Sequence, residues 1–201
     1  MNKETLQAIS DTAHSINVAN GFKEAESRKR SLALIISEMA EMLEADRKGK
    51  WSNKLLSDLA MRNSNVMYGM TTEQAHLFIL DTDGEFKADW FKETVKDTAE
   101  DELADVVIRI TSYLAACGYK MQYEQQSFSN IDFKQPVSEI IYDLMKAVTE
   151  ANKYGTEEEE LEGVAYACFE FAEAIGIDLE WHINAKLAYN RTRSYLHGKS
   201  Y

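Results

Sequence analysis

Hydrophobic residues recur every three or four positions along most of the chain, the spacing that places side chains on one face of an α-helix. Within about residues 23–49 this face consists of Leu32, Ile35, Ile36, Met39 and Leu43. Within about residues 89–118 it consists of Leu103, Val106, Val107, Ile110 and Leu114. The pattern therefore predicts two long helices. The same spacing predicts a helix over 3–18 and further helices over about 136–195.

The residues that favour turns also indicate an all-helical fold. The 201 residues include one proline and nine glycines, too few for the many tight turns of a β-sandwich or barrel. Pro136 lies where the first turn of a helix accepts proline, and Thr156 precedes four glutamates, 157–160, that suit a helix N-terminus. We expect residues 1–201 to form a single all-α helical bundle, with these glutamates exposed to solvent.

Net charge and the apolar runs exclude two classes of partner. The chain has 34 acidic and 22 basic residues, and its net charge of −12 has the wrong sign for binding nucleic acid through phosphates. No run of 18 apolar residues is present, and the N-terminal residues lack the apolar stretch of a signal peptide. We expect a cytoplasmic protein that binds neither nucleic acid nor a membrane.

Two pairs of acidic residues lie on the predicted core helices. Glu38 and Glu41 are three residues apart on the first long helix, and Glu102 and Asp105 repeat that spacing on the second. Residues at this spacing share one side of a helix, with Cβ atoms about 5–6 Å apart. Asp105 stands within an otherwise apolar run, where an ionised carboxylate is unfavourable unless it is paired or binds a metal. Packing of the two helices would bring four carboxylates together, which requires a neutralising cation.

The types of ligand indicate which cation would bind. Four carboxylates without histidine or cysteine form a hard oxygen site, which suits Mg²⁺ and also Mn²⁺. Each acidic pair alone has a simpler explanation, because acidic residues on helices often pair with a base one turn away, as Asp105 would with Arg109. The presence of two such pairs on two strongly apolar helices favours a metal site.

The last predicted helix carries a cationic stripe, which consists of Lys186, Asn190 and Arg193. These residues occupy positions i, i+4 and i+7, so they would share a face and present an ammonium, an amide and a guanidinium group to one polyphosphate. Cations near the end of a helix also complement its dipole, which is an alternative explanation for Arg193. A cationic stripe combined with an acidic metal cluster favours a metal-bound phosphate ester as the ligand.

These motifs resemble those of the MazG-like all-α nucleoside triphosphate pyrophosphatases. The resemblance is carried by Glu38-Met-Ala-Glu41, Glu102-Leu-Ala-Asp105 and Lys186-Leu-Ala-Tyr-Asn190-Arg-Thr-Arg193. It implies Mg²⁺-dependent hydrolysis of a nucleoside triphosphate to the monophosphate and pyrophosphate, in a homodimer or homotetramer. The resemblance further implies that the four acids hold Mg²⁺, that Glu38 or Glu41 accepts a proton from water, and that the cationic stripe binds the phosphates.

The sequence departs from the pattern of this family in two places. Ser37 stands where many members have a further acid, and sixty residues separate the two acidic pairs, more than the usual interval. The segment over about 51–90 is therefore an insertion between the metal-binding helices. The aromatic rings of Phe22 and Trp51 are candidates for stacking on a base, although aromatic side chains more often belong to a core.

Two other functions are alternatives to this one. A ferritin-like di-iron protein is also a carboxylate-lined bundle, but it needs two ExxH motifs, and only Glu73-Gln-Ala-His76 qualifies here. A non-enzymatic helical bundle that serves as an interaction module would carry the same acids as surface charge. The combination of acidic pairs and cationic stripe favours the nucleoside triphosphate pyrophosphohydrolase.

Overall fold

The computed structural model describes residues 1–52, 88–123, 131–153 and 155–195, and within these ranges it contains helices and no strand. The helices are α1 (Lys3–Ala19), the 3₁₀ helix η1 (Glu24–Glu26), α2 (Arg28–Arg47), α5 (Ala88–Thr94), α6 (Ala99–Ala116), α7 (Val137–Glu150), α8 (Glu157–Ile175) and α9 (Leu179–Arg191). The predicted all-α class is confirmed. Most of the predicted insertion, including Glu73 and His76, lies outside the described residues. No described helix has the length and apolar character needed to cross a bilayer.

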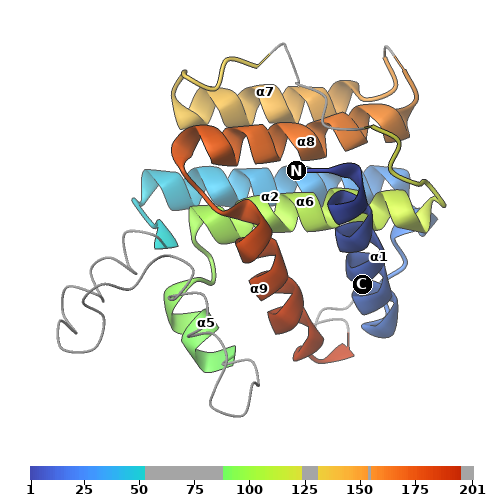
Figure 1. Cartoon of the computed structure of the whole chain (residues 1–201), viewed down its shortest axis with the longest axis horizontal. Helices are drawn as coiled ribbons and strands as arrows, with labels where there is room; N and C mark the ends of the chain where they lie inside the picture. Colours follow the sequence, from blue (N-terminus) through green and yellow to red (C-terminus); the bar gives the residue numbers. More distant parts are fainter. Residues whose placement is uncertain (53–87, 124–130, 154, 196–201) are drawn as a thin grey trace.

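The helices pack in three layers around α6. Helices α2 and α6 run side by side through the middle of the molecule, α7 and α8 cover one side of this pair, and α1, α5 and α9 lie on the other side (Figure 1). Helix α6 packs against α1, α2, α8 and α9. Because α6 is surrounded, most of its side chains are buried, including the first-turn acids Glu100, Asp101 and Glu102.

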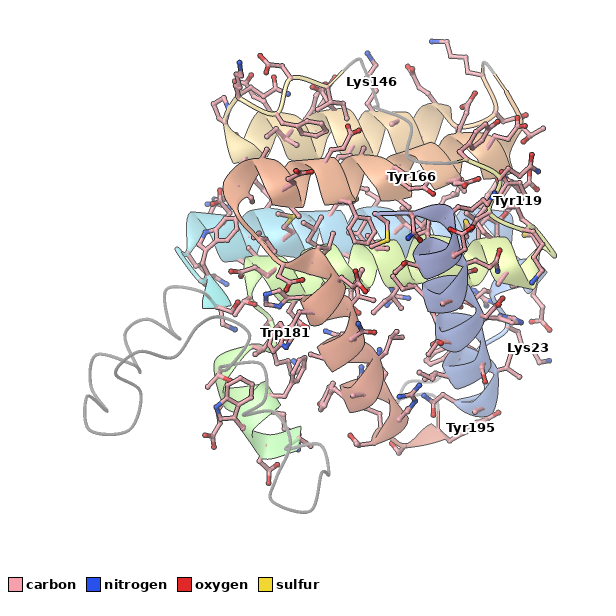
Figure 2. All side chains as sticks on the ribbon, viewed as in Figure 1. Lys23, Tyr119, Lys146, Tyr166, Trp181 and Tyr195 are labelled. Carbon is pink, nitrogen blue, oxygen red and sulfur yellow. The ribbon has the colours of Figure 1, made fainter. Side chains whose placement is uncertain are left out.

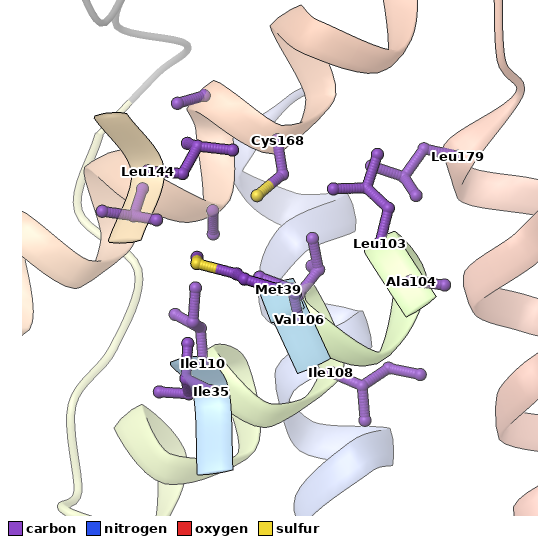
Figure 3. Packing of buried hydrophobic residues seen from close by; sticks show 14 of the residues in the cluster. Ile35, Met39, Leu103, Ala104, Val106, Ile108, Ile110, Leu144, Cys168 and Leu179 are labelled. Carbon is purple, nitrogen blue, oxygen red and sulfur yellow. The ribbon is translucent and has the colours of Figure 1, made fainter. Parts of the chain in front are cut away.

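The hydrophobic core fills the space between these layers. Figure 3 shows Met39 of α2 beside Val106 of α6, with Leu144 of α7 and Cys168 of α8 above them. All four side chains are almost completely buried. Burial of one such side chain contributes about 1.5–3 kcal/mol to the free energy of unfolding. The core therefore fixes α2 against α6, and with it the relative position of the acidic residues on these helices.

The helix predicted over about 89–118 is interrupted, and α5 and α6 are separate helices. Asp97 has a left-handed backbone with φ 60°, and Thr98 accepts a hydrogen bond from the backbone N–H of Asp101 as the N-cap of α6. The Asp101 carboxylate in turn accepts a hydrogen bond from the backbone N–H of Asp97 at 3.0 Å. The break gives α6 its own N-terminus, where acidic side chains are favoured by the helix dipole.

Two other helix boundaries differ from those predicted from the sequence. Ser27 caps α2, and the residues before it form η1 rather than the first turn of one long helix. Helix α9 ends at Arg191, with Thr192 as its C-cap. Arg193 therefore lies beyond the helix, so only Lys186 and Asn190 of the cationic stripe share a helical face.

The acidic first turn of α8 is less exposed than we expected. Glu157 is buried, accepts a hydrogen bond from the Tyr113 hydroxyl at 2.9 Å and forms an ion pair with Arg28. Glu162, one turn further along, is fully buried and accepts hydrogen bonds from the backbone N–H groups of Gln122 and Tyr123. These acids hold neighbouring segments against α8 and are not plain solvated surface.

Replacing Thr156 by alanine should lower the free energy of unfolding by about 1 kcal/mol. Thr156 and Glu159 form a capping box, in which each side chain accepts a hydrogen bond from the backbone N–H of the other residue. Thr149→Ala is a matched control because its exposed hydroxyl donates a hydrogen bond within α7, to the carbonyl of Lys146. Urea unfolding of both variants measures the difference, and equal stabilities would contradict the capping role.

Candidate functional site

The packing of α2 against α6 gathers three of the four predicted acidic residues. One carboxylate oxygen from each of Glu38, Glu41 and Glu102 lies within 4.8 Å of the other two. Glu38 and Glu102 are buried, whereas Glu41 is exposed. The group, here called the acidic cluster, is thus open to solvent on the Glu41 side and enclosed by protein on the other.

The acidic cluster fits Mg²⁺ in ligand type, and its oxygens lie within 4.8 Å of one another, close enough for small side-chain movements to bring them around one ion. Its ligands are carboxylate oxygens alone, and oxygens on opposite sides of a bound Mg²⁺ lie roughly 4 Å apart. A second group, Asp97, Asp101 and Glu102, satisfies the same distance limit and shares Glu102 with the first. Asp101 is fully buried, and its Oδ1 atom has no hydrogen-bond partner among the described residues. A buried carboxylate oxygen without a donor fits a place next to a cation.

The fourth predicted acid, Asp105, pairs with Lys186 instead of joining the acidic cluster. The Lys186 ammonium lies 2.8 Å from Asp105 Oδ2 and 2.6 Å from Asp101 Oδ2. Only 4% of the Lys186 surface is exposed. Burial lowers the pKa of Lys186, but the carboxylates of Asp105 and Asp101 more than offset this, and the pKa lies above its usual range. Lys186 is therefore a buried, charged link between α9 and α6.

Burial disfavours the ionised forms of the acids in this region. The pKa of Glu102 is raised to about 9, chiefly by burial; the Lys186 ammonium acts to lower it, and the negative charges of Asp105, Asp101 and Glu38 act to raise it. Burial likewise raises the pKa of Asp101 to about 6. The pKa of Glu38 is also raised by burial, although Arg109 forms an ion pair with this carboxylate. The buried Lys186 and the half-buried Arg109 thus neutralise the acids only in part, and a bound divalent cation would complete the neutralisation.

The metal-free protein should lose stability as the pH rises between about 5 and 9. Glu102 is protonated in the folded state and ionised in the unfolded state across this range, so the unfolded state binds fewer protons. This group alone gives a slope of at most about 1.4 kcal/mol per pH unit. Urea unfolding across the pH range, with EDTA present, should show a steeper fall for the wild type than for Glu102→Gln. Parallel curves for the two proteins would contradict this assignment.

A pocket of about 230 Å³ lies between the helices that carry the acidic cluster, although none of the three acids lines it. It is lined by Asn17, Gly21, Phe22, Lys23, Glu24, Glu26, Arg30, Ser31, Leu34, Asp105, Ile108, Arg109, Asn190 and Arg193. Leu34 lies one helical turn before Glu38 on α2, and Asp105 lies three residues after Glu102 on α6. Arg109 lines the pocket and also pairs with Glu38. The pocket and the acidic cluster therefore occupy adjacent stretches of the same interface between α2 and α6.

Of the residues predicted to bind phosphate or stack on a base, some line the pocket and others do not. Phe22, Asn190 and Arg193 line the pocket, and the Arg193 guanidinium lies 5.8 Å from the centre of the Tyr189 ring. Lys186 does not line the pocket, because it is held by the acids of α6. Trp51 packs against the main hydrophobic core and is also absent from the lining. The pocket thus combines an aromatic ring from the segment after α1, an amide from α9 and a guanidinium from the residues that follow α9.

Several residues of this region were not predicted from the sequence as site residues. Asp101 was missed, although its position three residues after Thr98 is a capping signal that would have placed it in the first turn of α6. Arg109 was considered only as a partner for Asp105, whereas it pairs with Glu38 of another helix. Asn17 and Glu24 gave no sequence signal, because only the fold brings α1 and η1 against α6.

Comparison with known proteins identifies no relative for this chain. No protein-family description, curated protein or solved structure matches it significantly. The arguments for its function therefore rest on the acidic cluster, the buried ion pairs and the pocket described above.

Proposed function

We propose that the protein hydrolyses nucleoside triphosphates to nucleoside monophosphates and pyrophosphate in a Mg²⁺-dependent reaction. The observation that carries the proposal is that Arg109, which pairs with Glu38 of the acidic cluster, also lines a pocket with further cationic and aromatic side chains. A magnesium ion on carboxylates commonly binds substrate phosphates with its remaining positions. The adjoining pocket has the groups that a nucleoside requires, namely an aromatic ring, apolar walls and a few polar atoms.

The residues of the acidic cluster have different parts in this scheme. Glu38, Glu41 and Glu102 would hold Mg²⁺, which when bound offsets negative charge on the phosphates. Glu38 forms an ion pair with Arg109. Glu41 is exposed, and among the described residues it accepts only a long hydrogen bond of 3.4 Å, from the Ser37 hydroxyl. Glu41 is therefore the residue better placed to accept a proton from the water that attacks the anhydride between the α- and β-phosphates.

Cations of the pocket would bind the polyphosphate and stabilise the leaving pyrophosphate. Arg109 lies at the junction of pocket and acidic cluster, and Arg193 reaches the pocket from the segment after α9. A guanidinium group can donate two parallel hydrogen bonds to a phosphate. Lys186, which the sequence suggested as a phosphate-binding residue, has a structural role in this scheme. It acts through Asp105 and Asp101, and we regard it as a positioning residue that keeps α9 and the pocket wall in place.

The proposal is tested by measuring pyrophosphate release from a panel of ribonucleoside and deoxyribonucleoside triphosphates with Mg²⁺. We expect at least one nucleotide to give stoichiometric monophosphate and pyrophosphate, and we expect EDTA to stop the reaction. Turnover that persists in EDTA would contradict the metal assignment. Absence of turnover with every nucleotide, in the presence of Mg²⁺ and of Mn²⁺, would contradict the proposed function and favour the non-enzymatic interaction module.

A further inference from the structure

The wall of the pocket formed by α1 and η1 carries polar side chains, here called the floor. Glu24 lies there and is largely buried, with 15% of its side chain exposed. Its Oε1 atom accepts a hydrogen bond of 3.0 Å from the amide nitrogen of Asn17, and its Oε2 atom accepts one from the hydroxyl of Ser112. The carboxylate is thus held rigidly by groups from α1 and α6, and it still lines the pocket.

The floor is attached to α2 about two helical turns before the acidic cluster. Ser31 of α2 donates a hydrogen bond to the backbone carbonyl of Glu24 at 2.8 Å, so η1 is attached to α2 at this residue. Ser31 precedes Glu38 by seven residues, which corresponds to roughly 10 Å along the helix. A triphosphate bound at the acidic cluster would therefore direct its nucleoside along α2 towards Glu24 and Asn17.

The polar atoms that the floor offers to a base are hydrogen-bond acceptors. The Asn17 amide nitrogen donates to Glu24 and to the Ser112 hydroxyl at 3.0 Å, which uses both of its hydrogens. The remaining Asn17 atom is the carbonyl oxygen, an acceptor, and each Glu24 oxygen retains a second lone pair. A base that presents an amino group satisfies such acceptors. A base that presents a carbonyl oxygen at the same position is repelled by the carboxylate.

The wall supplied by α9 adds a further acceptor. Asn190 is buried, with 6% of its surface exposed, and it lines the pocket. Its Oδ1 atom has no hydrogen-bond partner within the described part of the chain. A buried polar atom without a partner is unfavourable and points to a ligand group that completes it. A sugar hydroxyl or a base N–H would supply the missing donor.

From this arrangement we infer that Glu24 and Asn17 accept hydrogen bonds from the base, and that the pocket therefore prefers nucleotides whose base has an exocyclic amino group. Cytosine and adenine present such an amino group, whereas uracil and hypoxanthine present a carbonyl oxygen in its place. Phe22, which also lines the pocket, has a ring suited to stacking on the base. This inference deepens the proposed function and rests on it for the direction in which the nucleotide lies.

The test compares binding within two matched pairs of nucleoside monophosphates, dCMP with dUMP and dAMP with dIMP, measured by calorimetry without metal. Within each pair a carbonyl oxygen replaces the amino group at the position read, and the neighbouring ring nitrogen changes from an acceptor to an N–H donor. We expect the amino member of each pair to bind about tenfold more tightly or better, since a hydrogen bond to a charged group is replaced by repulsion. Equal binding within both pairs, tighter binding of the carbonyl members, or no binding of any monophosphate would overturn the inference.

Two variants locate the preference at Glu24. In Glu24→Gln an amide hydrogen replaces one acceptor, so the ratio of affinities should fall towards one. Glu26→Gln is the matched control, because Glu26 lines the same pocket but pairs with Lys23 at the surface and should keep the wild-type ratio. A Glu24→Gln protein that folds, as shown by circular dichroism, and keeps the full ratio would overturn the assignment to this residue.

The outcomes also separate this inference from the proposed function. Binding of the monophosphates requires neither Mg²⁺ nor hydrolysis, so a preference for amino-bearing bases without any turnover would sustain the inference and contradict the proposed function. Pyrophosphate release at equal rates from triphosphates of both kinds, with equal binding of their monophosphates, would support the proposed function and contradict the inference.

Discussion

Replacing Lys186 by methionine should lower the free energy of unfolding by about 3–5 kcal/mol. The Lys186 ammonium is buried against Asp101 and Asp105, at 2.6 and 2.8 Å. Removal of the ammonium leaves two carboxylates that face each other without a cation in a region of little solvent. Such a loss is a large part of the stability of a domain of this size, which is about 5–15 kcal/mol. Urea unfolding at neutral pH measures it.

The control for this prediction is Lys48→Met. Lys48 pairs with Glu44 at 3.2 Å on the surface of α2, where both side chains are about half exposed or more. An exposed pair of this kind contributes about 0–1 kcal/mol. We also expect Lys186→Arg, which keeps the positive charge, to lose less stability than Lys186→Met. Similar small losses for Lys48→Met and Lys186→Met would show that the buried link between α9 and α6 is unimportant.

Glu41→Gln should reduce kcat/KM for the best nucleotide roughly 100-fold or more. Loss of a residue that only orients a metal ligand costs about 10–100-fold, and loss of a ligand itself should cost more. The variant is informative because Glu41 is exposed and, within the described ranges, accepts only the long hydrogen bond from Ser37, so the fold should be unchanged. The Mg²⁺ concentration required for half-maximal rate should also rise. Steady-state kinetics over a series of Mg²⁺ concentrations gives both quantities.

Glu44→Gln is the matched control for this substitution. Glu44 lies three residues after Glu41 on α2, but its carboxylate pairs with Arg47 and Lys48 and does not join the acidic cluster. Its replacement should leave kcat/KM and the Mg²⁺ requirement unchanged. An equal loss of activity in both variants, or normal activity in Glu41→Gln, would remove the acidic cluster from the proposed reaction.

The periodicity of hydrophobic residues was sufficient to predict the all-α class and most of the helices. It placed the helix over 3–18, now α1, almost to the residue, because Asn2 caps it and Asn20 ends it. It missed the break between α5 and α6, because Phe91 and Val95 keep an apolar spacing although they belong to a separate small core against α9. Apolar spacing reports burial, and it does not distinguish one helix from two that are buried in different clusters.

Part of the candidate site could be predicted from the sequence, and whether a given residue could be placed depended on whether its neighbours belong to the same helix. Glu38 and Glu41 share one helix, so their spacing alone predicts that they lie close together. The presence of Glu102 beside them depends on how α2 packs against α6, which the sequence pattern indicates only in general terms. The pairing of Lys186 with Asp101 depends on the angle at which α9 crosses α6. Such contacts between distant segments leave no local signature in the sequence.

The most direct test of the central claim is phosphorus NMR of the products formed by the wild type with Mg²⁺ and the best nucleoside triphosphate. The proposed function predicts resonances of the monophosphate and of pyrophosphate in equal amounts, and neither should appear with Glu41→Gln over the same time. Resonances of a nucleoside diphosphate and of inorganic phosphate, or identical products at identical rates from Glu41→Gln, would contradict it.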